Sequence, residues 1–203
     1  MKTIIFDMYG VIIKESKGNF IPYTYSQFDE CDHERITNLF KVEKLFDKAG
    51  KGEINSFEFL SKLGFKDPIF HMRNYIENHL TIDNDFYSFA NEFSDKYKFS
   101  LLSNDVSDWS KYITKYYQLD KYFDVKIISG DVHIKKPNIK IFEITLKKLK
   151  SSVEDCIFID NCVENLKTAR SLGMDTILFN RDSEVYDGKI IYTFNELSCI
   201  LLS

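Results

Sequence analysis

The stretch FDMYGVI, Phe6–Ile12, places a carboxylate where a short, mostly apolar run ends. The run Thr3–Phe6 reads as a buried strand, and Asp7 follows it directly. A carboxylate held at the tip of a strand can attack an electrophile and form a covalent ester that water later hydrolyses. The sequence therefore makes Asp7 a candidate nucleophile.

Polar side chains also follow the other apolar runs along the chain. In a parallel α/β sheet the carboxyl ends of the strands share one edge, and ligands bind there. We therefore expect one crevice that gathers carboxylates, a hydroxyl and ammonium groups. The residues concerned are Asp7, then Ser103, Asn104 and Asp105, then Ser129–Asp131 with Lys135 and Lys136 just beyond, and finally Asp160 and Asn161.

These residue types suit displacement on an anionic substrate. Lys136 can neutralise the substrate and also keep Asp7 ionised. Ser103 can donate its hydroxyl to a substrate oxygen. Gly10 loosens the turn after Asp7, so backbone amides of this turn can add donors.

The elements that must position these residues are strands alternating with helices. The five apolar runs are continuous rather than alternating, which is typical of strands covered on both faces. Helical spacing indicates helices between them, and Asn138 is a candidate N-cap for one. This order predicts an α/β fold, a doubly wound, Rossmann-like parallel sheet. The runs are Thr3–Phe6, Phe99–Leu102, Val125–Ile128, Cys156–Ile159 and Thr176–Phe179, and the helices are Ile82–Tyr97, Asn138–Leu149 and Val163–Leu172.

The segment from Lys14 to Leu80 breaks the alternation because it has no clear apolar strand. Its apolar residues recur at helical spacing, so we expect a small helical domain inserted into the sheet domain. Within it, Asn55 and Glu58 have the spacing of a helix-capping pair. We place the boundaries at residues 1–14 and 81–203 for the core and 15–80 for the insertion.

Composition narrows the class of protein. The chain has 203 residues and a net charge of −4, which argues against nucleic-acid binding because that needs a basic face. No run approaches the ~20 apolar residues of a membrane span. Four cysteines without a CxxC pair, and no visible secretory signal, favour reduced thiols and a cytoplasmic location.

Four of the stretches above resemble, in order, the four motifs of the haloacid dehalogenase (HAD) superfamily. The inserted helices stand where that family carries its cap domain, and FDKAGKGEINSFEFL also resembles cap sequences of its phosphatase-like branch. The resemblance implies a hydrolase that acts on a small anionic substrate. The four stretches are FDMYGVI, LLSN (Leu101–Asn104), KKP (Lys135–Pro137) and FIDN with LGM (Phe158–Asn161, Leu172–Met174).

The resemblance also implies a role for each matching residue. Asp7 becomes the nucleophile, Lys136 rather than Lys135 the motif lysine, and Asp160 part of the acidic fourth motif. Ser103 and Asn104 correspond to the second motif and contact the substrate. The cap closes over the crevice, excludes water and selects the substrate.

Two residues depart from the pattern of the family's phosphatases. Tyr9 stands where they carry an aspartate that protonates the leaving alkoxide and then activates water, and a phenol with a pKa near ~10 is a poor base. Asn161 replaces a second aspartate that binds magnesium. The expected Mg²⁺ ligands are therefore the Asp7 carboxylate, the Tyr9 carbonyl and the Asn161 amide oxygen.

Three functions remain open from the sequence. The favoured one is hydrolysis of a small phosphomonoester. The second is metal-independent dehalogenation of a 2-haloacid, because Tyr9 gives the first motif the DxYG form of the family's dehalogenases and a halide leaves without a proton. That reaction needs a cation for the substrate carboxylate, with Arg35 or Arg73 as candidates. The third is a catalytically silent binding protein that keeps the crevice.

Overall fold

The computed structural model describes residues 1–202, and its centre is a six-stranded, fully parallel sheet with the order β3-β2-β1-β4-β5-β6. Strand β1 lies in the middle and the chain winds outward in both directions, which confirms the predicted doubly wound α/β fold. The strands are β1 (Thr3–Phe6), β2 (Lys98–Ser103), β3 (Val125–Ile128), β4 (Cys156–Asp160), β5 (Asp175–Phe179) and β6 (Lys189–Ile191).

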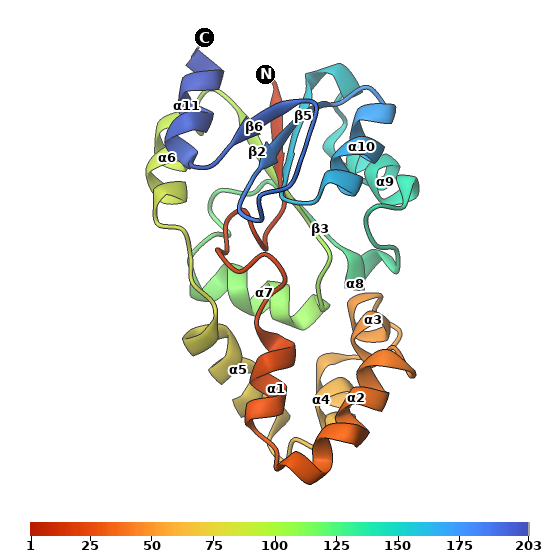
Figure 1. The fold of residues 1–203 in the computed structure, drawn as a ribbon. Coiled ribbons are helices and arrows are strands. Elements are labelled where there is room, and N and C mark those ends of the chain that lie inside the picture. The colour runs from red at the N-terminus through yellow and green to blue at the C-terminus, as the bar shows by residue number, and fades with distance from the viewer. Residues whose placement is uncertain (203) are drawn as a thin grey trace.

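Apolar side chains cover both faces of the sheet. On one face Phe6 packs edge-on against Phe86 and Phe89 of α6 (Asp85–Phe93), and α11 (Phe194–Leu202) lies beside this helix. On the other face lie α9 (Ile139–Leu149) and α10 (Val163–Ser171), as Figure 1 shows. Burial on both faces explains why the strand sequences are continuously apolar.

The structure adds one strand that the sequence reading did not include. Strand β6 has three residues, Lys-Ile-Ile, and pairs only with β5 at the edge of the sheet. A run this short gives no usable periodicity. The helix predicted over Ile82–Tyr97 is shorter, Asp85–Phe93, whereas Asn138 caps α9 as predicted by accepting a bond from the Lys140 amide.

The insertion between β1 and α6 is helical, as predicted. The two chain segments that enter and leave it are paired: Lys14 donates its amide to the Thr81 carbonyl (2.9 Å), and Asp83 donates to Ile12 (2.8 Å). The insertion therefore joins the core through two adjacent segments. Its helices are α1 (Phe20–Ser26), α2 (His33–Lys41), α3 (Leu45–Gly50), α4 (Ser56–Leu63) and α5 (Pro68–His79).

One helix of the core packs into the insertion. Helix α7 (Ser107–Tyr116) follows β2 and contacts α4 and α5. Its Trp109 is fully buried, lies 4.7 Å from the Phe20 ring and 5.3 Å from the Tyr75 ring, and donates its indole N–H to Ser56 Oγ (2.7 Å). This aromatic contact holds the insertion at the carboxyl edge of the sheet (Figure 1).

The structure also bears on the predictions made about membrane spans and cysteines. No helix within residues 1–202 has the length and apolar character needed to cross a membrane. The four cysteines are free thiols.

Candidate active site

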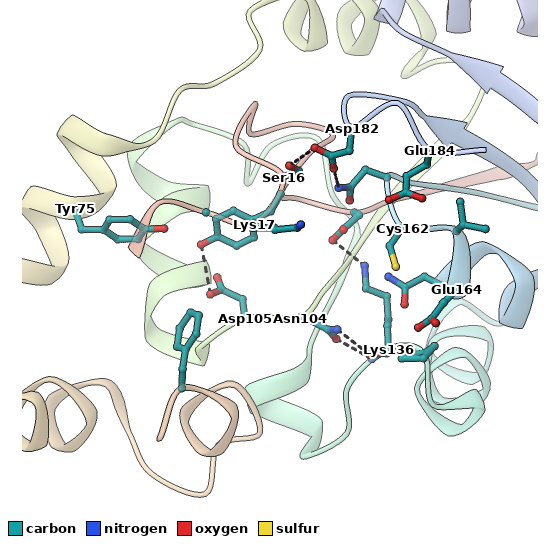
Figure 2. Close-up of a pocket in the computed structure, with 18 residues that line it drawn as sticks. Ser16, Lys17, Tyr75, Asn104, Asp105, Lys136, Cys162, Glu164, Asp182 and Glu184 are labelled. Carbon is teal, nitrogen blue, oxygen red and sulfur yellow. Dashed lines mark hydrogen bonds and ion pairs between the residues drawn. The ribbon is translucent and has the colours of Figure 1, made fainter. Parts of the chain in front are cut away.

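A cavity of about 530 Å³ lies between the carboxyl edge of the sheet and the helical insertion (Figure 2). The core contributes Asp7, Lys136 and Asn161 to its lining, and the insertion contributes Phe46 and Tyr75. Five of the strand-end residues predicted to share a crevice line this cavity, namely Asp7, Asn104, Asp105, Lys136 and Asn161. The others, Ser103, Ser129–Asp131, Lys135 and Asp160, are not part of its lining.

Asp7 is held at the tip of β1 and reaches the cavity. Its own amide donates to Ile159 of β4 (2.9 Å), while Asp7 Oδ1 accepts the Met8 amide (2.7 Å) and lies 2.8 Å from Lys136 Nζ. Burial and repulsion by Asp160 raise the pKa of Asp7 to about 7, and Lys136 and the Met8 amide only partly offset this. One carboxylate oxygen is therefore anchored while the side chain stays 11% exposed.

Lys136 is buried and bridges two carboxylates. Its ammonium contacts Asp7 Oδ1, Asp160 Oδ2 (2.7 Å) and the Leu102 carbonyl (2.9 Å). Burial lowers the pKa of Lys136, but attraction by Asp160 and Asp7 outweighs it, so the pKa lies above its usual value. Lys135, in contrast, points to Asp47 of the insertion (2.9 Å). The two neighbouring lysines thus have different partners.

Asp160 and Asn104 both position Lys136. Asp160 is fully buried, and it accepts bonds from Asn165 Nδ2 (3.0 Å) and the Cys162 amide (2.7 Å) in addition to Lys136. Asn104 uses both ends of its amide on the Lys136 backbone: its Oδ1 accepts from the lysine N–H (2.8 Å) and its Nδ2 donates to the lysine carbonyl (2.9 Å).

Ser103 ends β2 and is completely buried. Among residues 1–202 its Oγ is the only buried side-chain nitrogen or oxygen that has no hydrogen-bond partner. Ser103 is not part of the cavity lining, so its predicted contact with a substrate stays a prediction.

Tyr9 and Asp105 face each other in the cavity. The Tyr9 hydroxyl donates to Asp105 Oδ1 over 3.5 Å, and Asp105 also accepts bonds from Ser110 Oγ (2.6 Å) and the Val106 amide (2.8 Å). Burial and the nearby Asp105 raise the pKa of Tyr9 well above its usual value, so the hydroxyl stays protonated and donates its hydrogen bond to Asp105. Burial raises the pKa of Asp105 to about 7.

Asn161 is held by an aspartate to which the sequence reading gave no role. Asn161 Nδ2 donates to Asp182 Oδ2 (3.1 Å), and Ser16 Oγ donates to Asp182 Oδ1 (2.7 Å). Asp182 comes three residues after β5 and lines the cavity. Its position after a strand was the available signal, but its contacts arise only in the folded chain.

Gly10 has a steric role at this point. Its φ is +79°, and an added Cβ would lie 2.5 Å from Asn161 Cγ. Its N–H donates to the Ile13 carbonyl (2.7 Å) within the turn, so this amide is not turned toward a substrate. Only glycine lets the first-motif turn approach Asn161 this closely.

Neither arginine considered from the sequence reaches the cavity. Arg35 bonds to Asp32 (3.2 Å) and to the Leu63 carbonyl (3.0 Å), and Arg73 lies over the Tyr112 ring. The cation that joins Lys136 in the lining is instead Lys17, in the segment that leads into the insertion. Lys17 could not be predicted as a cavity residue, because its neighbours in the sequence are like those of any surface lysine.

The oxygen donors near Asp7 suit Mg²⁺ in kind. Carboxylate, carbonyl and amide oxygens are the ligands that this ion prefers, and Asp7, Tyr9 and Asn161 supply one of each. Within residues 1–202 no group of three or more histidine, cysteine, aspartate or glutamate residues is placed to hold a metal ion. The candidate site therefore fits Mg²⁺ in the type of its ligand atoms, but of the three candidate ligands only Asp7 carries a negative charge.

Comparison with known proteins identifies the family of this chain. Residues 1–173 match the family described as haloacid dehalogenase-like hydrolase. The chain belongs to this family. The HAD resemblance is thus confirmed, and this HAD-like hydrolase carries the expected parallel sheet, here of six strands, with a helical insertion.

Individual relatives are similar over parts of their length. The chain is 36% identical over 87 residues to drimenol cyclase drtB of Aspergillus calidoustus, covering 43% of this chain and 14% of the relative. It is 30% identical over 89 residues to glyceraldehyde 3-phosphate phosphatase of Methanothermobacter thermautotrophicus, covering 42% and 38%. The chain therefore spans well under half of the curated relatives it matches.

The fold is similar to solved structures over nearly its whole length. One is a HAD family enzyme from Bacteroides thetaiotaomicron in complex with magnesium and inorganic phosphate. The two superpose with a TM-score of 0.75 at 21% identity, covering 92% of this chain and 98% of the other.

Proposed function

We propose that this HAD-like hydrolase cleaves a small phosphomonoester through a covalent aspartyl-phosphate on Asp7. The observation that carries the proposal is the contact of Asp7 with Lys136 in the lining of the cavity, where the buried Asp160 holds the same ammonium group. A phosphoryl group next to Asp7 would meet the Lys136 charge.

The proposed reaction has two steps. A carboxylate oxygen of Asp7 attacks phosphorus, the bond from phosphorus to the ester oxygen breaks, and the alkoxide leaves as the alcohol by taking a proton from the Tyr9 hydroxyl or from water. Water then attacks the phosphorus of the aspartyl-phosphate and releases inorganic phosphate and the free Asp7 carboxylate. Lys136 holds Asp7 in place and offsets negative charge in both steps.

Mg²⁺, which one structural neighbour contains, would be held by Asp7, the Tyr9 carbonyl and Asn161, and would neutralise phosphate charge. Tyr9 can donate a proton to the leaving oxygen, but with its raised pKa it is poorly suited to activate water. We therefore expect aryl phosphates, whose leaving groups need no proton, to be hydrolysed faster than alkyl phosphates.

The test is phosphate release from 4-nitrophenyl phosphate with and without Mg²⁺. The wild-type protein should release phosphate, and Asp7→Asn should not. Asp131→Asn, which changes a half-exposed strand-end aspartate outside the cavity lining, serves as the control and should keep activity. Turnover by Asp7→Asn would refute the nucleophile assignment.

One observation favours dehalogenation as a second candidate. The hydroxyl of the half-buried Tyr9 is already hydrogen-bonded to Asp105, and a halide leaving group needs no proton. In this reaction Lys17, rather than an arginine, would meet the substrate carboxylate. Halide release from 2-chloropropionate without metal would support this function, and its absence together with phosphate release would exclude it.

A further inference from the structure

The cavity contains a buried carboxylate that has hydrogen bonds but no counter-ion. Asp105 is 5% exposed, and its oxygens accept bonds from Tyr9, Ser110 and the Val106 amide. Within residues 1–202 it takes part in no ion pair, and Lys136 is already shared by Asp7 and Asp160. A buried carboxylate without a cation is costly for a protein to keep.

Three aromatic side chains line the same cavity as this carboxylate. They are Tyr9, Tyr75 and Phe46. Tyr9 and Tyr75 are neighbours, because a Cβ added to Gly18 would lie 3.6 Å from Tyr9 Cε1 and 2.7 Å from Tyr75 Oη. Figure 2 shows Tyr75 on the same side of the cavity as Asp105, with Lys136 farther along.

Carboxylate and aromatic rings together form the chemistry that recognises organic cations. Ring faces attract ammonium groups through their quadrupole, and a desolvated carboxylate adds a full opposite charge. A neutral apolar group would fit the rings but would leave Asp105 without a charge partner. A second anion would be repelled by it.

The cavity therefore has two ends of opposite preference. Asp7 and Lys136 form one end, which the proposed function assigns to the phosphoryl group. Asp105 with Tyr9, Tyr75 and Phe46 forms the other. We propose that the substrate is a phosphomonoester of an amino alcohol, whose ammonium group binds between Asp105 and these aromatic rings.

Only the phosphate end of this inference rests on the proposed function, so the two ends are tested separately. The first experiment is calorimetric binding of choline and of 3,3-dimethylbutan-1-ol to the wild-type protein at pH 8. These ligands have nearly the same shape and differ in charge. We expect choline to bind at least about tenfold more tightly, the scale of one desolvated cation–aromatic contact. Equal affinities would overturn the inference.

Matched variants then locate the ammonium site. Asp105→Asn keeps side-chain hydrogen-bonding capacity but removes the charge, and it should abolish the preference for choline. Glu184→Gln removes another cavity carboxylate, and it should preserve the preference. Phe46→Leu keeps Asp105 and removes one ring, and it should reduce the preference. Loss of the preference in Glu184→Gln and not in Asp105→Asn would assign the effect to general charge and reject the site.

The second experiment compares phosphocholine with 3,3-dimethylbutyl phosphate on Asp7→Asn, which cannot turn over by the proposed route. Phosphocholine should bind more tightly than both choline and the neutral phosphate. If choline is preferred over the neutral alcohol but phosphate adds no affinity, the proposed phosphatase function fails and the ammonium site stands. If phosphate adds affinity but charge does not, the ammonium site fails alone.

Discussion

At the scale of single residues, Lys136 supplies the positive charge that offsets two buried carboxylates. Asp7 and Asp160 lie 2.8 and 2.7 Å from its ammonium, and Asp160 is fully buried. Repulsion by Asp160 contributes to the raised pKa of Asp7, and Lys136 is the cation that opposes it. The lysine is therefore a structural residue as well as a candidate catalytic one.

Replacing Lys136 by methionine should lower the free energy of unfolding by about 3 kcal/mol or more, because two buried charges lose their partner. Urea unfolding at pH 7 measures this. Lys135→Met is the matched control, since its ion pair with Asp47 is partly exposed and should contribute less than about 1 kcal/mol. Equal losses in the two variants would contradict the assignment of Lys136 as the buried lysine.

Asp105 gives a prediction about pH. Burial raises its pKa from an ordinary 3.8 to about 7, so the folded state binds this proton more tightly than the unfolded state does. The contribution of Asp105 to the free energy of unfolding therefore falls as pH rises from about 4 to about 7 and stays low above, and Asp7, with a pKa also raised to about 7, adds a contribution of the same sign. Asp105→Asn should raise the melting temperature at pH 8 and change it little at pH 4.

Thermal melts across this pH range test the prediction. Asp187→Asn is the control, because Asp187 is 79% exposed and pairs with Arg170, which lowers its pKa. That variant should not gain stability at pH 8. A wild-type pH slope that persists unchanged in Asp105→Asn would show that another group carries it.

At the scale of elements, the residues at the ends of the strands could be predicted from the sequence, whereas the contacts between loops could not. Asp7, Lys136 and Asp160 follow apolar strands or sit beside a proline, so local pattern places them at one edge of the sheet. Asp182 depends on a contact with Asn161, twenty-one residues earlier, and no local pattern encodes that distance. Lys17 reaches the cavity only because the insertion folds back over the sheet.

The Asn161–Asp182 bond yields a prediction about metal binding. Asn161→Asp would place a carboxylate where Nδ2 now donates to Asp182 over 3.1 Å. Without divalent cations this repulsion should lower stability by on the order of 1 kcal/mol, and Mg²⁺ should restore it by neutralising the pair. Melting temperatures in EDTA and in Mg²⁺ measure both effects.

A double variant controls this experiment. Asn161→Asp with Asp182→Asn exchanges the two groups and restores an amide–carboxylate bond, so its stability in EDTA should approach the wild type. If Mg²⁺ shifts the melting temperature equally in the wild type and in Asn161→Asp, the added carboxylate does not face the metal, and Asn161 is not a ligand.

At the scale of the whole molecule, the insertion and the core close the cavity together. Besides the Trp109 contact, α3 and the turn after it contact α8 (Ser129–Val132) and the residue that follows it. There His133 Nδ1 hydrogen-bonds to the Lys51 carbonyl (2.8 Å), and Ser129 Oγ donates to the Gly50 carbonyl. This contact is therefore a second connection between the insertion and the core, besides the paired connecting segments.

Gly52 lies at the centre of this contact and provides the test. Its φ is +67°, and an added Cβ would lie 2.1 Å from the Gly130 carbonyl oxygen. Gly52→Ala should push the insertion away from the core and lower kcat/KM for 4-nitrophenyl phosphate by about tenfold or more, as misplacement of a closing lid does.

Gly64→Ala is the matched control, because Gly64 also has a positive φ of +104° but faces Arg35 within the insertion. Both variants lose stability from backbone strain, whereas only Gly52→Ala should raise KM and enlarge the radius of gyration in solution scattering. Equal kinetic losses in the two variants would mean that strain, and not closure of the cavity, limits the enzyme.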